Sequence, residues 1–503
     1  MQLLLPLVLG PWAAVAPASE SARSSVGFIS STQQYATAAG LDILREGGNA
    51  ADAAAAVQMA LAVVQPQSTG IGGGCFVVMR NGATGEISAL DGREEAPELF
   101  HPNVFCLDED CLLNPECNCT QGPIPALERQ IGGLAVGVPG VIAAAARLLA
   151  DNGTMTLAQV MQPAIKLAEQ GFVMYRGMHD SIAANLNKLS RFQATRALYL
   201  NPAGTAPRVA VGDIFANPDL ADTLRLLSDE GAAAFYSEGP LPVEIVAAAH
   251  DAVNENTGKY GLMSQADLAG YAAVYRSPII STYRGRTLIG MPMPASGGTA
   301  LAQIFNWLEG FEMPRRRTNF QPREMSAEVL HRFIDAQNAA FADRNMYAAD
   351  ADYADVPTVG LIEKRYAAAR REELSRLVSA VPTPIPAGSP AGASAHYASA
   401  PPSAENGTTH FSVVDRDGTL VAFTTTIEAN WGSGVVVPGR GFLLNNELTD
   451  FSAVGIDEET GLPFANAPEG GKRARRTALG ADAATVGGKR PRSSMCVYAK
   501  PQK

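Results

Sequence analysis

The chain has 503 residues, of which 47% are hydrophobic and 18% are charged, and this composition is typical of a soluble globular protein. At roughly 150 residues per domain, the length allows two to four domains or one larger unit that mixes helices and strands. The chain carries 50 acidic and 39 basic residues, for a formal net charge of −11, which argues against nucleic acid as a partner.

The N-terminus resembles a secretory signal peptide. Residues 3–18 form an uncharged, mostly apolar run that ends in Ala-Pro-Ala before Ser19. The run is short for a bilayer span, which favours a signal peptide. No Lys or Arg precedes it, which is unusual for a signal peptide, and a short membrane anchor or a plain strand are the alternatives. We expect residues 1–18 to be a signal peptide and the protein to be secreted or to enter a secretory compartment.

Helices and one hairpin are predicted in the N-terminal half. Residues 36–64 give two helical patterns separated by Gly47-Gly48-Asn49, and the second is so rich in alanine and apolar residues that it should be buried. Residues 68–94 predict a glycine turn, a buried strand, a turn at Asn81-Gly82 and a second strand that ends at Arg93. Further helices are predicted within the ranges 137–153, 156–171 and 327–374.

Four of the six cysteines lie within residues 105–123, at Cys106, Cys111, Cys117 and Cys119. In a secreted chain such a cluster predicts one or two local disulfides, with three possible connectivities if all four cysteines pair. A zinc site is the alternative, but the cluster has no pair of cysteines two residues apart and contains no histidine. We therefore expect disulfides here and no metal.

The composition changes before residue 408. Residues 379–405 are rich in Pro, Ala, Ser and Gly and have no apolar periodicity, so we expect a mobile linker. A strand, an Asp-Gly turn and a second strand are predicted directly after it. The stretch 439–451 predicts one more apolar strand and a polar turn that carries Glu447 and Asp450.

The hairpin after the linker has a register that can be predicted. If the loop is Arg416-Asp417-Gly418, with the glycine in the left-handed conformation, Asp415 faces Thr419. Counting outward then places Thr408 opposite Thr426, so that two hydroxyl groups meet across the hairpin. A shift of one residue would move Thr426 to the other face of the sheet.

Thr408 is a candidate nucleophile if the bond between Gly407 and Thr408 is cut. An N-terminal threonine needs no histidine, because its own α-amine, with a pKa of about 8, serves as the general base. Gly407 presents an unhindered carbonyl to the Thr408 hydroxyl for an N-to-O acyl shift. The chain has no serine flanked by glycines two residues to each side and no H-E-x-x-H motif, which removes the common hydrolase alternatives.

The order of motifs resembles that of the γ-glutamyltranspeptidases, or glutathione hydrolases, which are self-cleaving N-terminal-nucleophile hydrolases. The resemblance covers most of residues 26–496 and rests on "GLDILREGGNAADAAAAVQMAL", "STGIGGGCFVV", "DGREEAP", "VGVPGV", "MPASGGTALAQI", "FADR", "TTHFSVVDRDGTLVAFTTTIEANWGSGV", "GFLLNNELTDFS" and "GKRPRSSM". It implies an α+β fold of the Ntn-hydrolase type, a four-layer αββα sandwich. A large segment, residues 19–407, and a small segment, residues 408–503, would build this fold jointly.

The resemblance also implies roles for individual residues. Thr408 corresponds to the nucleophile and new N-terminus, and Thr426 to the threonine that hydrogen-bonds it. In the family an arginine and a serine pair hold the α-carboxylate of the substrate, and acidic or amide side chains meet its α-ammonium group. The matching residues are Arg93, Ser493 and Ser494 for the carboxylate and Glu428, Glu447 and Asp450 for the ammonium group. Taken singly, Arg93 could be a surface residue paired with a neighbouring glutamate, and the others could be turn or loop residues.

The implied reaction is cleavage of a γ-glutamyl amide such as glutathione through an ester on Thr408. Water, an amino acid or a dipeptide would then release the γ-glutamyl group, and no metal or organic cofactor is expected. The family's oxyanion Gly-Gly pair follows the serine pair, but no Gly-Gly occurs after Met495, so the small segment looks truncated. The alternatives are an unprocessed, inactive homologue and a related amide acylase, which would keep Thr408 but need not keep Arg93 and Asp450.

Overall fold

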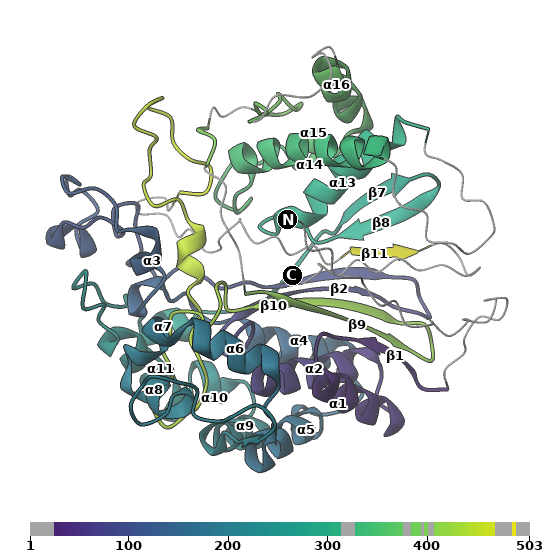
Figure 1. The fold of residues 1–503 in the computed structure, drawn as a ribbon. Coiled ribbons are helices and arrows are strands. Elements are labelled where there is room, and N and C mark those ends of the chain that lie inside the picture. The colour runs from purple at the N-terminus through teal and green to yellow at the C-terminus, as the bar shows by residue number, and fades with distance from the viewer. Residues whose placement is uncertain are drawn as a thin grey trace, which may run out of the picture.

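The computed structural model describes residues 25–312, 327–375, 384–393, 397–400 and 407–467, together with the backbone of one further strand at 485–488. A layer of helices, two stacked sheets and a second layer of helices follow one another across the molecule (Figure 1). This order confirms the predicted α+β fold with four αββα layers. The expected signal peptide at 1–18 lies outside the described residues.

The larger sheet combines strands from both sides of residue 408. Its six strands are all antiparallel and follow the order β1-β9-β10-β2-β3-β6. Because β9 and β10 lie between β1 and β2, the chain after residue 408 supplies the centre of a sheet whose flanks come from the chain before it. The strands span β1 Gly27–Ser30, β2 Gly74–Arg80, β3 Ile87–Gly92, β6 Val274–Arg276, β9 Thr409–Asp415 and β10 Leu420–Thr426.

The smaller sheet packs over the larger one. It contains β7 (Ile279–Tyr283), β8 (Arg286–Gly290) and β11 (Thr485–Gly488) in the order β11-β8-β7. An apolar layer seals the two sheets, with residues from β2, β3, β8 and β10 in contact: Phe76, Val78, Ala89, Ile289, Leu420 and Ala422. A separate two-stranded ribbon joins β4 (Phe172–Val173) to β5 (Ile214–Phe215).

The two helical layers differ in size. The larger layer covers the outer face of the six-stranded sheet, and α13, α14, α15 and α16 cover the smaller sheet (Figure 1). The helices of the larger layer are α1 Gln34–Arg45, α2 Ala50–Val64, α4 Val141–Asn152, α5 Leu157–Gln170, α6 Arg176–Ala184, α7 Leu186–Ser190, α8 Gln193–Tyr199, α9 Pro218–Glu230, α10 Ala233–Tyr236 and α11 Leu241–Asp251. The others are α3 Ala126–Arg129, α12 Gln265–Ala269, α13 Ser296–Glu309, α14 Ala327–Tyr347, α15 Thr358–Leu361 and α16 Lys364–Ser375.

Helix α2 confirms the prediction of a buried alanine-rich helix, since all of its residues are buried against the sheet and its neighbours. The interruption before it acts as a start signal. The Asn49 side chain accepts hydrogen bonds from the N–H groups of Ala51 and Asp52, and the Asp52 carboxylate accepts one from the Asn49 N–H. This reciprocal capping box fixes the first turn of the helix.

Two local predictions were wrong. The β2–β3 connection is a wider loop rather than a two-residue Asn-Gly turn: Asn81 accepts from the N–H groups of Ala83 and Thr84, and Gly85 takes the positive φ of 75°. The apolar stretch near residue 443 forms isolated bridges instead of a strand. Glycines with positive φ interrupt that stretch, so it cannot extend into a ladder.

The segment 379–405, expected to be a mobile linker, contains two described stretches with defined contacts. The N–H of Gly388 donates to the Asp343 carboxylate, and the Tyr347 hydroxyl donates to the Gly388 carbonyl. The N–H of Ala400 donates to the carbonyl of Asn345. These stretches therefore pack against helix α14 and its C-terminal end, although nothing in their composition predicts it.

In the structure the cysteine cluster forms two disulfides, Cys106–Cys119 and Cys111–Cys117, which is one of the three possible connectivities. Among the described residues, the one group with metal-ligand proximity is Cys106, Asp108 and Cys111. Because both of its cysteines are in disulfides, the zinc alternative fails. Phe105 of this loop shares an apolar cluster with Phe451, just after the turn that carries Glu447 and Asp450, and the ring of Phe100 contacts both rings.

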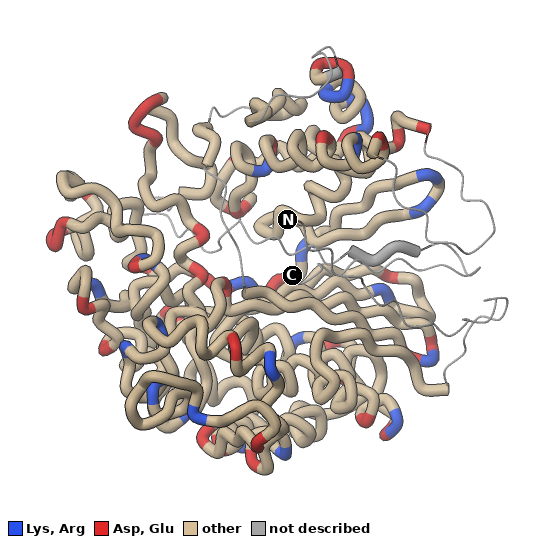
Figure 2. The backbone as a smooth tube through the Cα atoms, in the orientation of Figure 1, with Lys and Arg blue, Asp and Glu red and all other residues tan. Residues whose placement is uncertain are grey.

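Charged residues of both signs are interspersed along the outer parts of the described chain (Figure 2). Within the described ranges, no helix combines the length and the apolarity that a bilayer span requires. The N-terminal run that prompted the alternative of a membrane anchor lies outside these ranges.

His410 gives the sheet a predicted pH dependence. Its ring nitrogens contact the hydroxyl groups of Thr424 and Ser412 at 2.8 and 3.3 Å, and burial lowers its pKa to about 4. An unfolded histidine has a pKa near 6.5, so between pH 6.5 and pH 4 the unfolded chain binds a proton that the folded chain does not. Stability should fall as the pH drops through this window, by about 2 to 3 kcal/mol in total.

Urea unfolding of wild type and of the His410→Gln variant at pH 7, 5.5 and 4.5 checks this expectation. The wild type should lose more stability than the variant on acidification. Parallel losses in the two proteins would show that His410 is not responsible.

Candidate functional site

The hairpin that begins with Thr408 has the predicted register. Strands β9 and β10 pair so that continuing the ladder sets Thr408 opposite Thr426, and the Thr408 Oγ1 donates to Thr426 Oγ1 at 3.0 Å. Gly418 has a φ of 81°, and the Asp415 carboxylate accepts from the N–H of Thr419. The glycine turn therefore fixes the register that brings the two threonine hydroxyls together.

The two adjacent threonines point to opposite faces of the sheet. Thr409 is 3% exposed, and its hydroxyl lies 3.0 Å from that of Thr32. Thr408 is partly exposed and shares the inter-sheet face with His410. Thr426 Oγ1 accepts a second hydrogen bond, from the N–H of Glu428 at 2.8 Å, which holds the oxygen that Thr408 contacts.

Gly407 lies directly against the loop that follows β10. A Cβ atom added to Gly407 would collide with the backbone of residues 428–430, so only glycine allows this close approach. Glu428 and Trp431 have φ values of 70° and 69°, which non-glycine residues rarely adopt. The backbone is therefore strained next to the Gly407–Thr408 bond, where strain of this kind is often functional.

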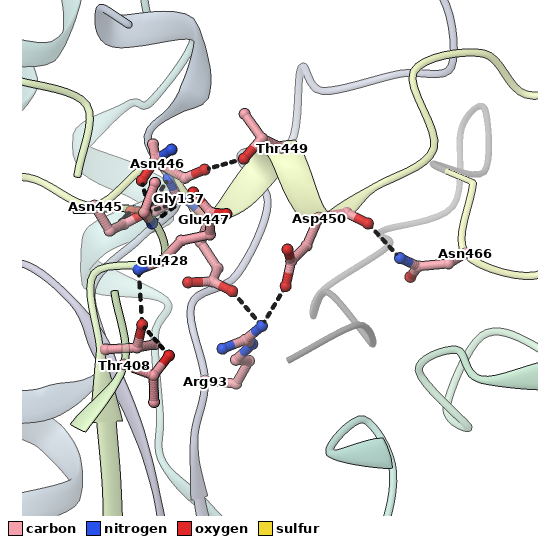
Figure 3. Close-up of polar contacts among 12 residues, drawn as sticks. Arg93, Gly137, Thr408, Glu428, Asn445, Asn446, Glu447, Thr449, Asp450 and Asn466 are labelled. Atoms are coloured by element: carbon pink, nitrogen blue, oxygen red, sulfur yellow. Dashed lines mark hydrogen bonds and ion pairs between the residues drawn. The ribbon is translucent and has the colours of Figure 1, made fainter. Parts of the chain in front are cut away.

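Arg93 is 1% exposed and forms ion pairs with Glu447 and Asp450 (Figure 3). Its Nη2 lies 2.7 Å from Asp450 Oδ2, and its guanidinium lies 5.6 Å from the ring centroid of Phe76. The structure thus brings together three residues that are separated by up to 357 positions. The alternative of a surface ion pair is wrong, because Arg93 and its neighbour Glu94 are both buried.

Glu447 and Asp450 belong to a 3-10 helix, Glu447–Asp450, whose start is fixed by Asn445. The Asn445 amide donates to the carbonyls of Gly72 and Gly137 at 2.8 Å, and its oxygen accepts from the N–H groups of Gly137 and Glu447. A single buried amide therefore ties this helix to the glycine turn before β2. Figure 3 shows the carboxylates of Glu447 and Asp450 converging on Arg93.

The site carries more acidic than basic groups. Burial raises the pKa of Glu447 well above its usual range, and the nearby carboxylates of Glu94, Asp450 and Glu428 add to this effect, while Arg93 opposes it. A second guanidinium, that of Arg129, lies in the field of Glu428 and Asp450, and burial lowers its pKa. Buried acidic surroundings of this kind favour a ligand group that brings a positive charge.

A Glu447→Gln substitution should stabilise the protein at neutral pH. A carboxyl group whose folded pKa is raised contributes stability that is present at low pH and lost as the pH rises through the folded value. The amide removes this loss while keeping the size of the side chain, so the thermal midpoint should rise at pH 8 and change little at pH 4.5. Calorimetry at both pH values checks this, and a lower midpoint at pH 8 would contradict it.

The sequence analysis assigned no role to three residues of the site, Asn445, Arg129 and Lys188. Lys188 lies on α7, far in sequence from the hairpin. Ser493 and Ser494 lie outside the described residues, and their place in the site stays a prediction. A doubled asparagine before a polar turn was the available signal for Asn445, whereas nothing in the sequence around Lys188 distinguishes it from a solvated helical lysine.

Comparison with known proteins places these features in one family. The profile of the family described as Gamma-glutamyltranspeptidase matches residues 36–481. The glutathione hydrolase proenzyme of Escherichia coli (strain K12) is 34% identical over 476 residues, which cover 94% of this chain and 72% of that protein.

Two solved structures extend the comparison. The Helicobacter pylori gamma-glutamyltranspeptidase is 32% identical and superposes with a TM-score of 0.65 over 76% of this chain and 100% of that chain. The cephalosporin acylase from Bacillus halodurans is 27% identical, with a TM-score of 0.72 over 96% of this chain and 78% of that chain. The chain therefore belongs to the gamma-glutamyltranspeptidase family.

Proposed function

We propose that this enzyme cuts itself between Gly407 and Thr408 and then transfers or hydrolyses γ-glutamyl groups, with glutathione and its conjugates as substrates. The observation that carries the proposal is the hydroxyl pair of Thr408 and Thr426 at the head of β9, on the same site as the Arg93–Asp450 ion pair. The first group supplies an N-terminal nucleophile, and the second supplies the two charges that a γ-glutamyl head group requires.

The self-cleavage step uses the hydroxyl of Thr408. Its Oγ attacks the carbonyl carbon of Gly407, the peptide C–N bond breaks, and the released nitrogen of Thr408 takes the hydroxyl proton. Water then hydrolyses the ester, which leaves a carboxylate on Gly407 and a free α-amine and hydroxyl on Thr408. The loop at 428–431 is strained and packs on Gly407. We expect this contact to distort the peptide between Gly407 and Thr408 and so to favour attack on its carbonyl carbon.

Turnover repeats the same chemistry on the substrate. The Thr408 α-amine accepts the hydroxyl proton, Oγ attacks the γ-carbonyl carbon, and the leaving amine departs with a proton. Water, an amino acid or a dipeptide then attacks the γ-glutamyl ester and restores the free hydroxyl. Thr426 keeps the Thr408 oxygen in place, because its own oxygen is already fixed by the Glu428 N–H.

Recognition of the γ-glutamyl head group follows from charge. The planar guanidinium of Arg93 suits the α-carboxylate, since its fork can donate parallel hydrogen bonds. Asp450 and Glu447 lie on the same guanidinium and can accept from the α-ammonium group. Together with Glu428 they place more negative than positive charge around the proposed position of the α-ammonium group. Ser493 and Ser494 are proposed to complete the carboxylate site.

A related amide acylase is the second candidate, because the cephalosporin acylase superposes well. Paired assays with γ-glutamyl anilide and glutaryl anilide separate the two, since the glutaryl group keeps the carboxylate and lacks only the α-ammonium group. We expect the γ-glutamyl compound to be turned over at least 100-fold faster, equal to about 2.7 kcal/mol of discrimination. Equal rates, or a preference for glutaryl anilide, would favour the acylase.

The cellular location and the partners of the site are part of the same proposal. The two disulfides support a secreted or secretory-compartment protein, since such bonds persist in oxidising surroundings. The partners we propose are small γ-glutamyl compounds and acceptors, and the large and small fragments of the chain itself. The shared six-stranded sheet would keep those fragments together after cleavage.

A further inference from the structure

The loop that follows β10 has an unusual anchor. Residues 428–434 contain two non-glycine residues with positive φ, and Gly432 and Gly434 have φ values of 51° and 78°. A loop in this conformation does not hold itself, because each such non-glycine residue costs free energy that surrounding contacts must offset. The contacts that hold this loop in place therefore help to determine the geometry of the site.

Lys188 is the charged group that reaches into this loop from helix α7. Its Nζ donates to the carbonyl oxygens of Asn430 and Gly432 at 3.1 and 3.0 Å, one on each side of Trp431. The stem of the side chain lies along Gly434, where an added Cβ atom would be 3.0 Å from Lys188 Cγ. Burial lowers the pKa of Lys188 to about 8, and the nearby Glu428 carboxylate opposes that shift.

These carbonyls belong to the same short stretch that touches the cleavage site. The backbone of residues 428–430 packs on Gly407, and the Glu428 N–H holds the oxygen of Thr426. The ammonium group of Lys188 thus fixes one side of the loop, while the other side contacts both the scissile bond and the partner of the nucleophile. No residue of the mechanism described above performs this task.

We propose that Lys188 is a positioning residue for self-cleavage, which holds the loop at 428–432 against Gly407 so that the Thr408 hydroxyl is aligned with the Gly407 carbonyl. The inference rests on the proposed function, because it concerns the bond that the proposed enzyme cuts. It adds a residue from the large segment, 220 positions before the nucleophile, to the group that controls maturation.

Thr195 offers a matched control. Its hydroxyl donates to the Gly434 carbonyl at 2.6 Å and accepts from the Val436 N–H at 3.0 Å. It therefore anchors the same loop with two hydrogen bonds, as Lys188 does, but at the end away from Gly407. A purely structural role for Lys188 would make the two residues equivalent.

The test compares the rate of self-cleavage in freshly purified wild type and in the variants Lys188→Met, Lys188→Arg and Thr195→Val, together with their thermal midpoints. We expect Lys188→Met to cleave at least tenfold more slowly and Lys188→Arg to recover most of that rate, because arginine keeps the charge and the donors. Thr195→Val should lower the thermal midpoint by as much as Lys188→Met while cleaving within threefold of the wild type.

Each outcome bears on one proposal. Wild-type cleavage together with an unchanged rate in Lys188→Met overturns the role of Lys188 alone, as does an equal slowing in Thr195→Val. A wild type that does not cleave overturns the proposed function, and the role of Lys188 with it. Should Lys188→Met fail to fold, the Lys188→Arg protein decides. Cleavage near the wild-type rate agrees with the proposal. A Lys188→Arg protein that keeps its thermal midpoint but does not cleave contradicts it, because arginine keeps the charge and the hydrogen-bond donors.

Discussion

Replacing Thr408 by alanine is expected to give a single uncut chain with no measurable γ-glutamyl transfer. The variant loses the hydroxyl that attacks Gly407 and that would later carry the γ-glutamyl ester, so both reactions fail together. Removal of the covalent nucleophile lowers turnover on the order of 10⁶-fold in a well-studied acyl-transfer enzyme. Gel analysis and an assay with γ-glutamyl anilide measure the two losses in the same sample.

Two control variants make this result specific. Thr408→Ser keeps a hydroxyl and should still cut itself, at a reduced rate. Thr409→Ala removes the adjacent hydroxyl, which contacts Thr32 on the opposite face of the sheet, and should cost stability while leaving cleavage in place. Retained cleavage in Thr408→Ala would contradict the assignment of the nucleophile.

Replacing Arg93 by methionine is expected to have the second largest effect. The variant removes the guanidinium that would bind the α-carboxylate, so kcat/KM should fall about 30- to 5000-fold, as for the loss of one partner of a buried charge pair, which costs about 2 to 5 kcal/mol. It also removes the charge that compensates Glu447 and Asp450, which should lower stability by about 3 to 5 kcal/mol.

A double variant separates these two effects. Adding Glu447→Gln to Arg93→Met removes one of the carboxylates and should restore part of the thermal midpoint. It should restore none of the activity, because the proposed carboxylate contact is still missing. Recovery of activity together with stability would mean that Arg93 acts only as a structural counter-charge.

The sequence predicted best where a turn controls the geometry. Gly418 sets the hairpin, the hairpin sets the register, and the register places Thr408 opposite Thr426. The interruption at Gly47-Gly48-Asn49 likewise marked the start of α2. In these cases one local rule acts over a few residues, so a short stretch of sequence contains all the information that the structure uses.

The rest of the site depends on contacts between distant segments. Resemblance assigned Arg93 and Asp450 to one substrate group, but only the fold shows them at 2.7 Å and buried with Glu447. Lys188 looks like any helical lysine until α7 is packed on the loop after β10. The apolar stretch near residue 443 was wrongly predicted to be a strand. Its backbone makes single bridges to Gly72 and Val436, and the apolar pattern does not reveal which backbone groups will pair.

Self-cleavage at Gly407–Thr408 is the central claim, and the intact mass of the freshly purified wild-type chain tests it most directly. We predict two products whose masses add up to the precursor plus one water, the smaller one beginning with Thr408-Thr409-His410. A Thr408→Ala chain purified in parallel should show only the precursor mass. A wild type that also remains a single uncut species, or that is cut at another bond, would contradict the account.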